Sequence, residues 1–275
     1  MPGYKATVGD CEIISLTDVQ MQFPWSMFLP NVPIAEIEAY RDLYPETYGQ
    51  GMFKTDAGAY AMRSGGKTVL VDTGIGPGPV TMLGGIEGKM LSDMKAKGIS
   101  PEDVDIVVHT HLHFDHVGWN VTGGAPTFPN ATYYASQVDA DFFFENTASN
   151  PQIAKQVAPL KELGRFKTFA GEFSPAPNLT AIPTPGHTPG HHSVLVSSGG
   201  EMAIITGDVA HHPSQVDHPE WATGFDVDAA AAAATRKAIV ERLEREGGIA
   251  AFCHFPGEGF GRIVRSGNRR VFQAL

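Results

Sequence analysis

Four side chains that can bind a metal ion lie within six residues of one another. The segment VDIVVHTHLHFDHVGWN begins as an apolar strand and then presents, in order, His111, His113, Asp115 and His116. Alternate side chains of an extended segment project to the same side, so His111 and His113 can reach one ion. The chain then turns, and Asp115 and His116 can face a second ion beside the first. Imidazole and carboxylate ligands suit Zn²⁺, and also Fe, Co or Mn, whereas a ligand set without thiolates argues against a closed structural zinc site.

Short strands and a few helices must position this segment. The sequence predicts strands over residues 11–19, 104–110, 131–136, 179–184, 192–198 and 201–208, and a hairpin over residues 59–73 around Gly65-Gly66. A helix is expected over residues 90–98, where Gly98 would end it, and another over residues 228–246, between the N-cap Asp228 and Gly247. This order predicts a layered α/β protein, although periodicity alone does not choose between a sandwich and a doubly wound sheet.

The His111–His116 segment resembles the signature of the metallo-β-lactamase superfamily, and other segments are similar to the remaining motifs of that family, in the family's order. They are VDTGIG (71–76), TPGHTPGHHS (184–193), ITGDVAHH (205–212) and FCHFPGEGFG (252–261). The resemblance implies a single domain over residues 1–275 with a four-layer αβ/βα sandwich fold. It also implies two bound divalent metal ions, with zinc expected and cobalt, manganese or iron as alternatives.

The same resemblance distributes the ligands between the two ions. His187 would complete the first site with His111 and His113. His254 would complete the second site with Asp115 and His116. Asp208 would bridge both ions, and Asp72 would buttress the loops that carry the ligands.

Two adjacent divalent ions favour hydrolysis as the reaction. A metal ion lowers the pKa of its bound water from 15.7 to roughly 7, so that a metal-bridging hydroxide is available at neutral pH. We therefore expect a dinuclear hydrolase whose hydroxide attacks an ester or lactone carbonyl. Asp115 or His211 would assist the proton transfer.

The substrate class depends on residues other than the ligands, because one fold and metal centre can serve many reactions. N-acyl homoserine lactonases usually carry a tyrosine three residues after the bridging aspartate, where this sequence has His211. The segments around residues 207–221, 225–241 and 254–263 instead resemble the methyl parathion hydrolase and lactonase-like branch, which implies lactones, aryl esters or, as the alternative, phosphotriesters. His211 could polarise the substrate or protonate the leaving group, or it could be bonded to the backbone near the metal ions. A β-lactamase and a non-hydrolytic diiron protein are less favoured alternatives.

Aromatic residues near the predicted site are candidates for the substrate pocket. Trp25 and Phe28 belong to the stretch MQFPWSMFLPNVP, whose prolines predict an irregular loop that either covers the metal ions or forms a dimer contact. Trp119 follows the metal-binding segment so closely that we expect it in the pocket. Cys253 precedes His254, and we expect it to be a small buried apolar residue.

Composition restricts the partners of the protein. Its 275 residues include 20 Lys and Arg against 30 Asp and Glu, a net charge of −10. That charge argues against nucleic acid and anionic membranes as partners, since both require basic surfaces. Two cysteines are too few for a disulfide framework, and no signal peptide is recognisable, so we expect a cytoplasmic protein with a small-molecule substrate.

Overall fold

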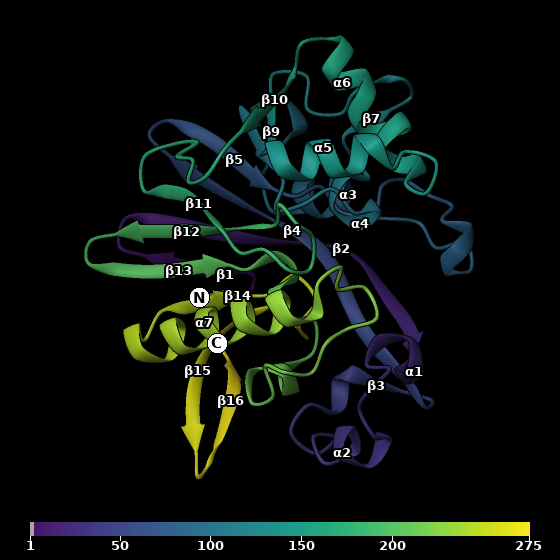
Figure 1. The fold of residues 1–275 in the computed structure, drawn as a ribbon. Coiled ribbons are helices and arrows are strands. Elements are labelled where there is room, and N and C mark those ends of the chain that lie inside the picture. The colour runs from purple at the N-terminus through teal and green to yellow at the C-terminus, as the bar shows by residue number, and fades with distance from the viewer. Residues whose placement is uncertain (1–2) are drawn as a thin grey trace.

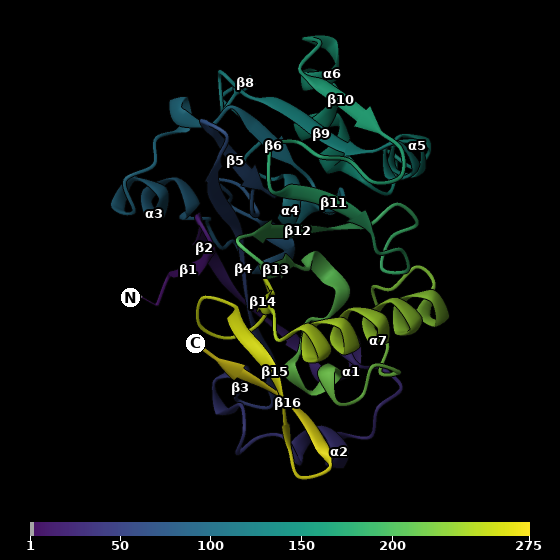
Figure 2. The same ribbon diagram turned by 90° about the vertical axis from the view of Figure 1, so that its left-hand side faces the viewer.

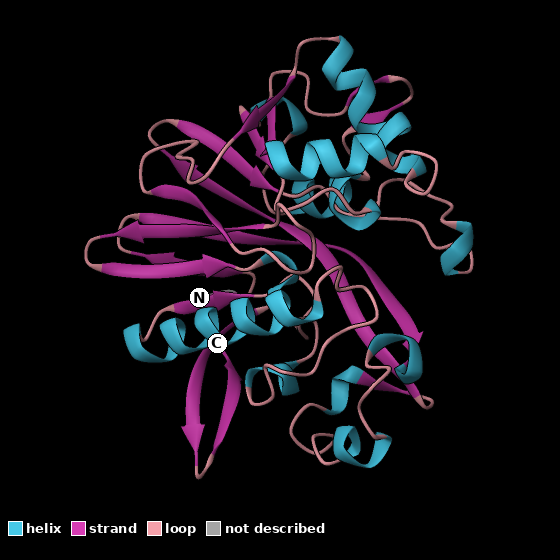
Figure 3. Cartoon of the chain, viewed as in Figure 1, coloured by secondary structure: helices cyan, strands magenta, loops and turns pink. Residues whose placement is uncertain are grey.

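Two β-sheets pack face to face in the computed structural model, which describes residues 3–275 (Figures 1 and 2). The first sheet has eight strands in the order β1-β2-β4-β5-β6-β9-β10, with β3 paired to β4. The second has six strands in the order β11-β12-β13-β14-β15-β16, and β7 pairs with β8 separately. Helices cover the outer faces of both sheets (Figure 3).

The strands of the first sheet are β1 (Lys5–Val8), β2 (Cys11–Pro24), β3 (Tyr48–Gly49), β4 (Met52–Ser64), β5 (Lys67–Val71), β6 (Ile106–Val108), β9 (Thr132–Ser136) and β10 (Phe166–Phe169). Those of the second sheet are β11 (Leu179–Pro183), β12 (His192–Ser198), β13 (Glu201–Ile205), β14 (Ile249–Ala251), β15 (Phe260–Ser266) and β16 (Arg269–Ala274). The small pair is β7 (Val121–Thr122) and β8 (Ala125–Pro126).

The α-helices are α1 (Trp25–Phe28), α2 (Ile34–Glu38), α3 (Met90–Ala96), α4 (Phe114–Val117), α5 (Gln137–Glu145), α6 (Ala158–Glu162) and α7 (Ala229–Glu246). Short 3₁₀ turns are η1 (Pro45–Thr47), η2 (Thr81–Leu83), η3 (Pro101–Asp103), η5 (Gly207–Val209) and η6 (Pro213–Val216), and η4 (Ile153–Val157) is a π-helical turn. Among the described residues, no helix is both long and apolar enough to cross a membrane.

Each sheet buries both of its faces, which gives the fold four layers. In β5, Val69 and Val71 belong to the apolar cluster between the sheets, whereas Leu70 belongs to the cluster beneath the helices of the first sheet. In β13, Ile205 likewise faces the other sheet, and Ile204 packs in the cluster that contains Leu243 of α7. This alternation follows from the two-residue period of a strand. The α/β four-layer sandwich predicted from the sequence is confirmed.

The capping and turn residues predicted from the sequence lie at the ends of α7 and in the hairpin between β4 and β5. Asp228 accepts hydrogen bonds from the N–H groups of Ala230 and Ala231 at the start of α7, and Gly247 follows its last residue with a φ of 64°. The hairpin between β4 and β5 turns at Gly65 and Gly66, both of which have positive φ, as the tight turn of a hairpin requires.

The Pro-rich stretch near residue 25 differs from its prediction. Only residues 29–33 are irregular, because β2 stays paired with β4 as far as Pro24, which lies opposite Met52. Pro24 occupies the last position of the strand, where a missing N–H does not interrupt the sheet. The helix α1 begins directly after it.

The strand order gathers five loops at one edge of the sandwich. The strands β5 and β6 are parallel, so the residues that follow them, Asp72 and the segment 111–116, lie together. In the second sheet β13 and β14 are parallel, which places Asp208 beside His254. The loop 184–191 reaches the same edge because β12 runs antiparallel to β13. Ends of parallel strands are a common place for a binding site in α/β folds.

Candidate metal centre

The first cluster consists of four buried or half-buried residues, His111, His113, His187 and Asp208, whose ligand atoms all lie within 4.8 Å of one another. His113 Nδ1 lies 2.9 Å from His111 Nε2 and 2.9 Å from His187 Nε2. Asp208 Oδ2 lies 3.1 Å from His187 Nε2 and 3.5 Å from His111 Nε2. Three imidazole nitrogens and one carboxylate oxygen thus converge on one point.

The second cluster shares Asp208 with the first. The other carboxylate oxygen of Asp208, Oδ1, lies 3.1 Å from His116 Nε2 and 3.2 Å from His254 Nε2. Asp115 approaches from the first turn of α4, with carboxylate oxygens 3.9 Å from His116 Nε2 and 3.7 Å from His254 Nε2. Asp208 therefore faces one cluster with each of its two oxygens, as a bridging ligand must.

The chemistry of these donors fits two divalent cations. His116 Nε2 is buried and has no aligned hydrogen-bond partner among the described residues, although Asp208 is close to it. Burial lowers the pKa of His111 and His113 well below the usual value, which favours the neutral rings that can bind a metal. At His116, burial also opposes the charge, but Asp208 and Asp72 outweigh it and raise the pKa, so this part of the site favours positive charge. The two clusters could therefore hold two divalent metal ions.

The outward nitrogens of the rings are held by other groups. His111 Nδ1 lies 3.0 Å from Thr110 Oγ1, His116 Nδ1 lies 2.9 Å from Asp72, and His254 Nδ1 donates to the carbonyl of Asp56 at 2.7 Å. Such partners fix the ring orientation and the tautomer of a metal-binding histidine.

Asp72 links the end of β5 to the loop that carries His111 and His116. Its two oxygens accept hydrogen bonds from the N–H and the hydroxyl of Thr110, and it has an unusual positive φ of 63°. Burial opposes ionisation of Asp72, but His116 and His109 outweigh this effect and lower the pKa of its carboxyl to about 2. Asp72 is therefore an ionised acceptor that holds Thr110 and His116 in place.

Three buried residues that sequence reasoning did not identify support the ligands. His191 Nε2 accepts the N–H of Asp208 at 3.0 Å, and Asp226 contacts His187. Asp139, on α5, accepts the N–H of Gly190 and the hydroxyl of Thr188 in the His187 loop. His191 lies within the motif at residues 184–193, whereas no local pattern marks Asp139 or Asp226 as a partner of a distant loop.

His211 lies beside the bridging carboxylate. Its Nε2 is 3.1 Å from Asp208 Oδ2, and its ring stacks on that of His254 with centroids 5.0 Å apart. Its backbone N–H donates to Gln215, whereas its buried Nδ1 has no hydrogen-bond partner among the described residues. The ring therefore faces the cluster with Nε2 and keeps Nδ1 buried.

A cavity of about 240 Å³ opens above both clusters. His113, Asp115, His187, Asp208, His211 and His254 contribute to its floor, together with Thr55. Its walls are mainly apolar and come from Phe23, Met27, Phe28, Phe114 and Phe225. The rings of Phe28 and Phe225 lie 5.9 Å apart, and the Phe28 ring contacts that of His211 at 5.3 Å. Phe28 thus lies where the sequence predicts a pocket residue.

The two tryptophans predicted for this pocket do not line it. Trp25 lies on the other side of α1, where its ring packs against Phe53 and His212 at 5.0 and 5.4 Å and borders a separate apolar cavity. The indole N–H of Trp119 donates to the buried carboxylate of Asp18 at 3.1 Å, so this ring is directed into the core beneath the loop. Neither the Pro-rich stretch around Trp25 nor the proximity of Trp119 to the metal-binding segment indicated the direction of these side chains.

A layered sandwich with two such clusters at one sheet edge defines a dinuclear metalloprotein. The family model of the metallo-beta-lactamase superfamily matches residues 57–254, and the chain belongs to that superfamily. The resemblance recognised from the motifs is thereby confirmed at the level of the superfamily.

Several characterised proteins resemble the chain in sequence. An N-acyl homoserine lactonase from Bacillus sp is 28% identical over 206 residues, which cover 68% of this chain and 76% of that protein. The N-acyl homoserine lactonase AiiA of Bacillus thuringiensis subsp. kurstaki is 27% identical over 202 residues, with the same coverage of 68% and 76%.

Solved structures resemble it along almost its whole length. The hydrolase AbOPH, described as a member of the beta lactamase superfamily, has a TM-score of 0.87 and 28% identity, and the match covers 99% of this chain and 97% of that one. AidC, a dizinc quorum-quenching lactonase in complex with a product, has a TM-score of 0.83 at 22% identity and covers 98% and 96%. At that identity AidC supports the fold alone.

Proposed function

We propose that the chain is a dinuclear metal-dependent hydrolase that opens lactones, or cleaves esters, whose non-reacting part is apolar. The observation that carries this proposal is the cavity, where the two ligand clusters form the floor and five apolar side chains form the walls. Pockets of this composition bind an apolar ligand and orient it with a few polar groups. The N-acyl homoserine lactonases that resemble this chain in sequence add support for a lactone substrate.

The first ion would be bound by His111, His113 and His187. The second ion would be bound by His116, His254 and Asp115. Asp208 would bind both ions. Divalent ions at these positions would supply an activated water at neutral pH and a Lewis acid for the carbonyl oxygen. We propose zinc for both positions, because imidazole and carboxylate ligands with a position left open for water are typical of catalytic zinc.

The residues of the chain would orient the substrate and move the proton. The apolar walls would bind the acyl or aryl arm and exclude water from it, which directs the carbonyl towards the floor. Asp115 lines the cavity beside His254 and His116, where it can accept a proton from the attacking water. His211 lines the same cavity, and its Nε2, which lies beside Asp208, would donate the proton to the leaving oxygen.

A substrate panel tests the proposed activity. Zinc-loaded protein should be assayed against short- and long-chain N-acyl homoserine lactones, aromatic lactones, aryl esters, phosphotriesters and β-lactams. We expect the largest kcat/KM for lactones or aryl esters with apolar arms. Strong turnover of β-lactams without lactone or ester hydrolysis would contradict the proposal, and preference for phosphotriesters would favour the alternative predicted from the sequence.

The role of His211 can be separated from metal binding by leaving-group dependence. If His211 protonates the leaving oxygen, His211→Gln should lower kcat for lactones, which release an alkoxide, by about 10²-fold or more. The same variant should change kcat little for nitrophenyl esters, whose leaving group needs no proton. An equal loss for both substrates, with unchanged metal content, would exclude this role.

A further inference from the structure

Cys253 packs against the apolar core between the sheets and also reaches the second cluster. Its Sγ is 3.6 Å from Asp208 Oδ1. The ligand atoms of His116, Asp208, Cys253 and His254 all lie within 4.8 Å of one another, and Asp115 is outside that group of four. The sequence prediction of a small apolar residue agrees with the packing of Cys253 against the core but not with its contact with Asp208.

The spacing around Cys253 suits a shared ion. With metal–nitrogen distances of about 2.0–2.1 Å and a metal–sulfur distance of about 2.3 Å, tetrahedral ligand atoms stand roughly 3.3–3.7 Å apart. Asp208 Oδ1 lies 3.1 Å from His116 Nε2, 3.2 Å from His254 Nε2 and 3.6 Å from Cys253 Sγ. The buried His116 Nε2, which has no aligned hydrogen-bond partner among the described residues, belongs to the same group of atoms.

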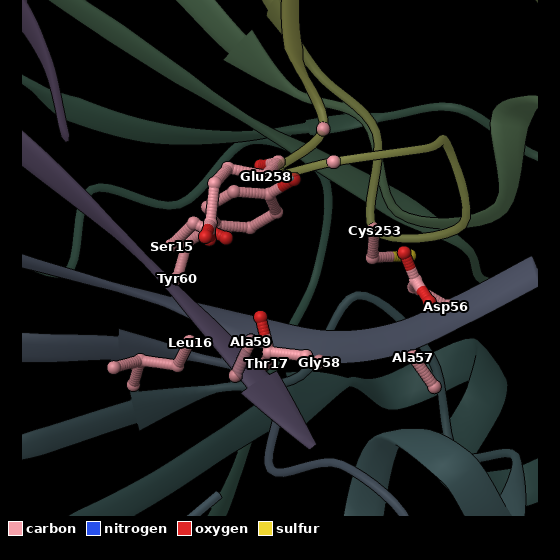
Figure 4. Close-up of a pocket in the computed structure, with 12 residues that line it drawn as sticks. Ser15, Leu16, Thr17, Asp56, Ala57, Gly58, Ala59, Tyr60, Cys253 and Glu258 are labelled. Carbon is pink, nitrogen blue, oxygen red and sulfur yellow. Dashed lines mark hydrogen bonds between the residues drawn. The ribbon is translucent and has the colours of Figure 1, made fainter. Parts of the chain in front are cut away.

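Cys253 and Asp115 approach this position from different cavities. Asp115 lines the cavity with the aromatic walls, whereas Cys253 lines a second, smaller cavity with Asp56, Tyr60 and Glu258. Figure 4 shows Cys253 and Asp56 at the same end of that second cavity. A ligand from Cys253 would therefore leave the substrate side of the ion open.

We propose that Cys253 binds the second metal ion through its thiolate, together with His116, His254 and Asp208, and replaces Asp115 in the ligand set of that ion. Asp115 keeps its proposed role as the proton acceptor on the side of the larger cavity. The inference rests on the dinuclear centre proposed above and is independent of the substrate. On binding, the sulfur–hydrogen bond breaks, a sulfur–metal bond forms, and the proton passes to solvent. The two sites then differ, since a soft thiolate is present in the second and absent from the ligand set of the first.

Cobalt titration tests this assignment directly. Metal-free protein should be titrated with Co²⁺ up to two equivalents while its absorbance is recorded. Visible ligand-field bands report binding at either site, and a near-ultraviolet thiolate-to-cobalt band reports sulfur ligation. We expect the near-ultraviolet band in the wild type and its loss in Cys253→Ala, which should also bind the affected equivalent about 10- to 100-fold more weakly.

The chain offers a matched control, because it contains one other cysteine. Cys11 is buried in the core between the sheets, at the start of β2. Cys11→Ala should keep the near-ultraviolet band, and circular dichroism should show that both alanine variants are folded. If Cys253→Ala fails to fold, X-ray absorption of zinc-loaded Cys11→Ala protein should still show a sulfur scatterer at about 2.3 Å from zinc.

The results separate failure of this inference from failure of the proposed centre. Visible cobalt bands for two equivalents without a near-ultraviolet band would overturn Cys253 as a ligand and leave the dinuclear site intact. Retention of the near-ultraviolet band in Cys253→Ala would also overturn Cys253 as a ligand and leave the dinuclear site intact. If no cobalt binds, the dinuclear centre itself fails, and the assignment of Cys253 fails with it.

Discussion

His187 Nδ1 lies 3.1 Å from Asp226 Oδ1, so a proposed metal ligand is bonded to a carboxylate that lies 39 residues further along the chain. The other oxygen of Asp226 accepts a hydrogen bond from Arg236 at 3.2 Å. Arg236 is fully buried in α7 and also donates to the carbonyls of Val209 and Trp221. The longest helix of the fold thus orients a metal ligand through one buried carboxylate.

This relationship predicts that Asp226→Asn weakens metal binding. His187 and Arg236 outweigh the burial of Asp226 and lower the pKa of its carboxyl, so the wild-type group is an ionised acceptor. An amide removes that charge, and the loss of such a partner typically lowers metal affinity by about 10–100-fold. Competition with a metal chelator measures the change.

The exposed Asp42, changed to Asn, serves as the control for Asp226. It should leave the chelator competition unchanged. Equal metal affinities in Asp226→Asn and the wild type would show that the charge of Asp226 does not contribute to metal binding by His187.

Asp139 predicts a pH dependence of stability. Burial outweighs its hydrogen bonds from Thr188 and Gly190 and raises the pKa of its carboxyl from 3.8 to about 6. Between about pH 4 and 6 the folded state therefore binds more protons than the unfolded state, and the free energy of unfolding decreases as the pH rises through this range. Above about pH 6 the contribution is constant.

Asp139→Asn should remove this dependence, because an amide of the same shape does not ionise. Urea unfolding of metal-free protein should show the stability of the variant, relative to the wild type, increasing from pH 4 to 6 by up to about 3 kcal/mol. A difference that stays constant over this range would mean that Asp139 ionises normally in the folded protein.

The position of Phe225 in the cavity wall predicts that this residue contributes to a preference for long apolar arms on the substrate. The residue is 36% exposed, and its ring contacts those of Phe23 and Phe28 at the cavity wall. Phe225→Ala should raise KM for long-chain lactones by about tenfold, with a smaller effect on short-chain lactones, because less apolar area is buried on binding. Steady-state kinetics on a chain-length series measures the ratio.

Leu163→Ala is the matched control for Phe225, since Leu163 is 59% exposed and lies outside the cavity. It should leave the chain-length preference unchanged. If Phe225→Ala affects short and long chains equally, the wall does not bind the apolar arm.

Short-range patterns predicted the strands and the metal-binding segment from His111 to His116, whereas the resemblance to the superfamily implied the four-layer sandwich and the remaining ligands. Val69, Leu70 and Val71 alternate between two cores, and His111 and His113 share one side of an extended segment directly after a strand. The loops meet because parallel strands end at one edge, which the order of the motifs already implied.

The remainder of the site depends on contacts between distant segments. Trp119 is directed into the core by Asp18, which lies 101 residues earlier, and no pattern near Trp119 indicates this. Asp226 contacts His187, and Asp139, on α5, accepts a hydrogen bond from Gly190 in the same loop as His187. Cys253 could be placed beside Asp208 only once β13 and β14 were known to be parallel neighbours.

The central claim is that Asp208 joins two metal sites on which hydrolysis depends. It is tested most directly by measuring metal content and lactone hydrolysis together in the wild type and Asp208→Ala, with the exposed Asp141→Asn as control. We predict two ions per chain and full activity in the wild type and the control. For Asp208→Ala we predict loss of at least one ion and activity below about one-hundredth of the wild type, since even an outer partner of a ligand is worth about 10–100-fold. Retention of two ions and full hydrolysis by Asp208→Ala would contradict the account.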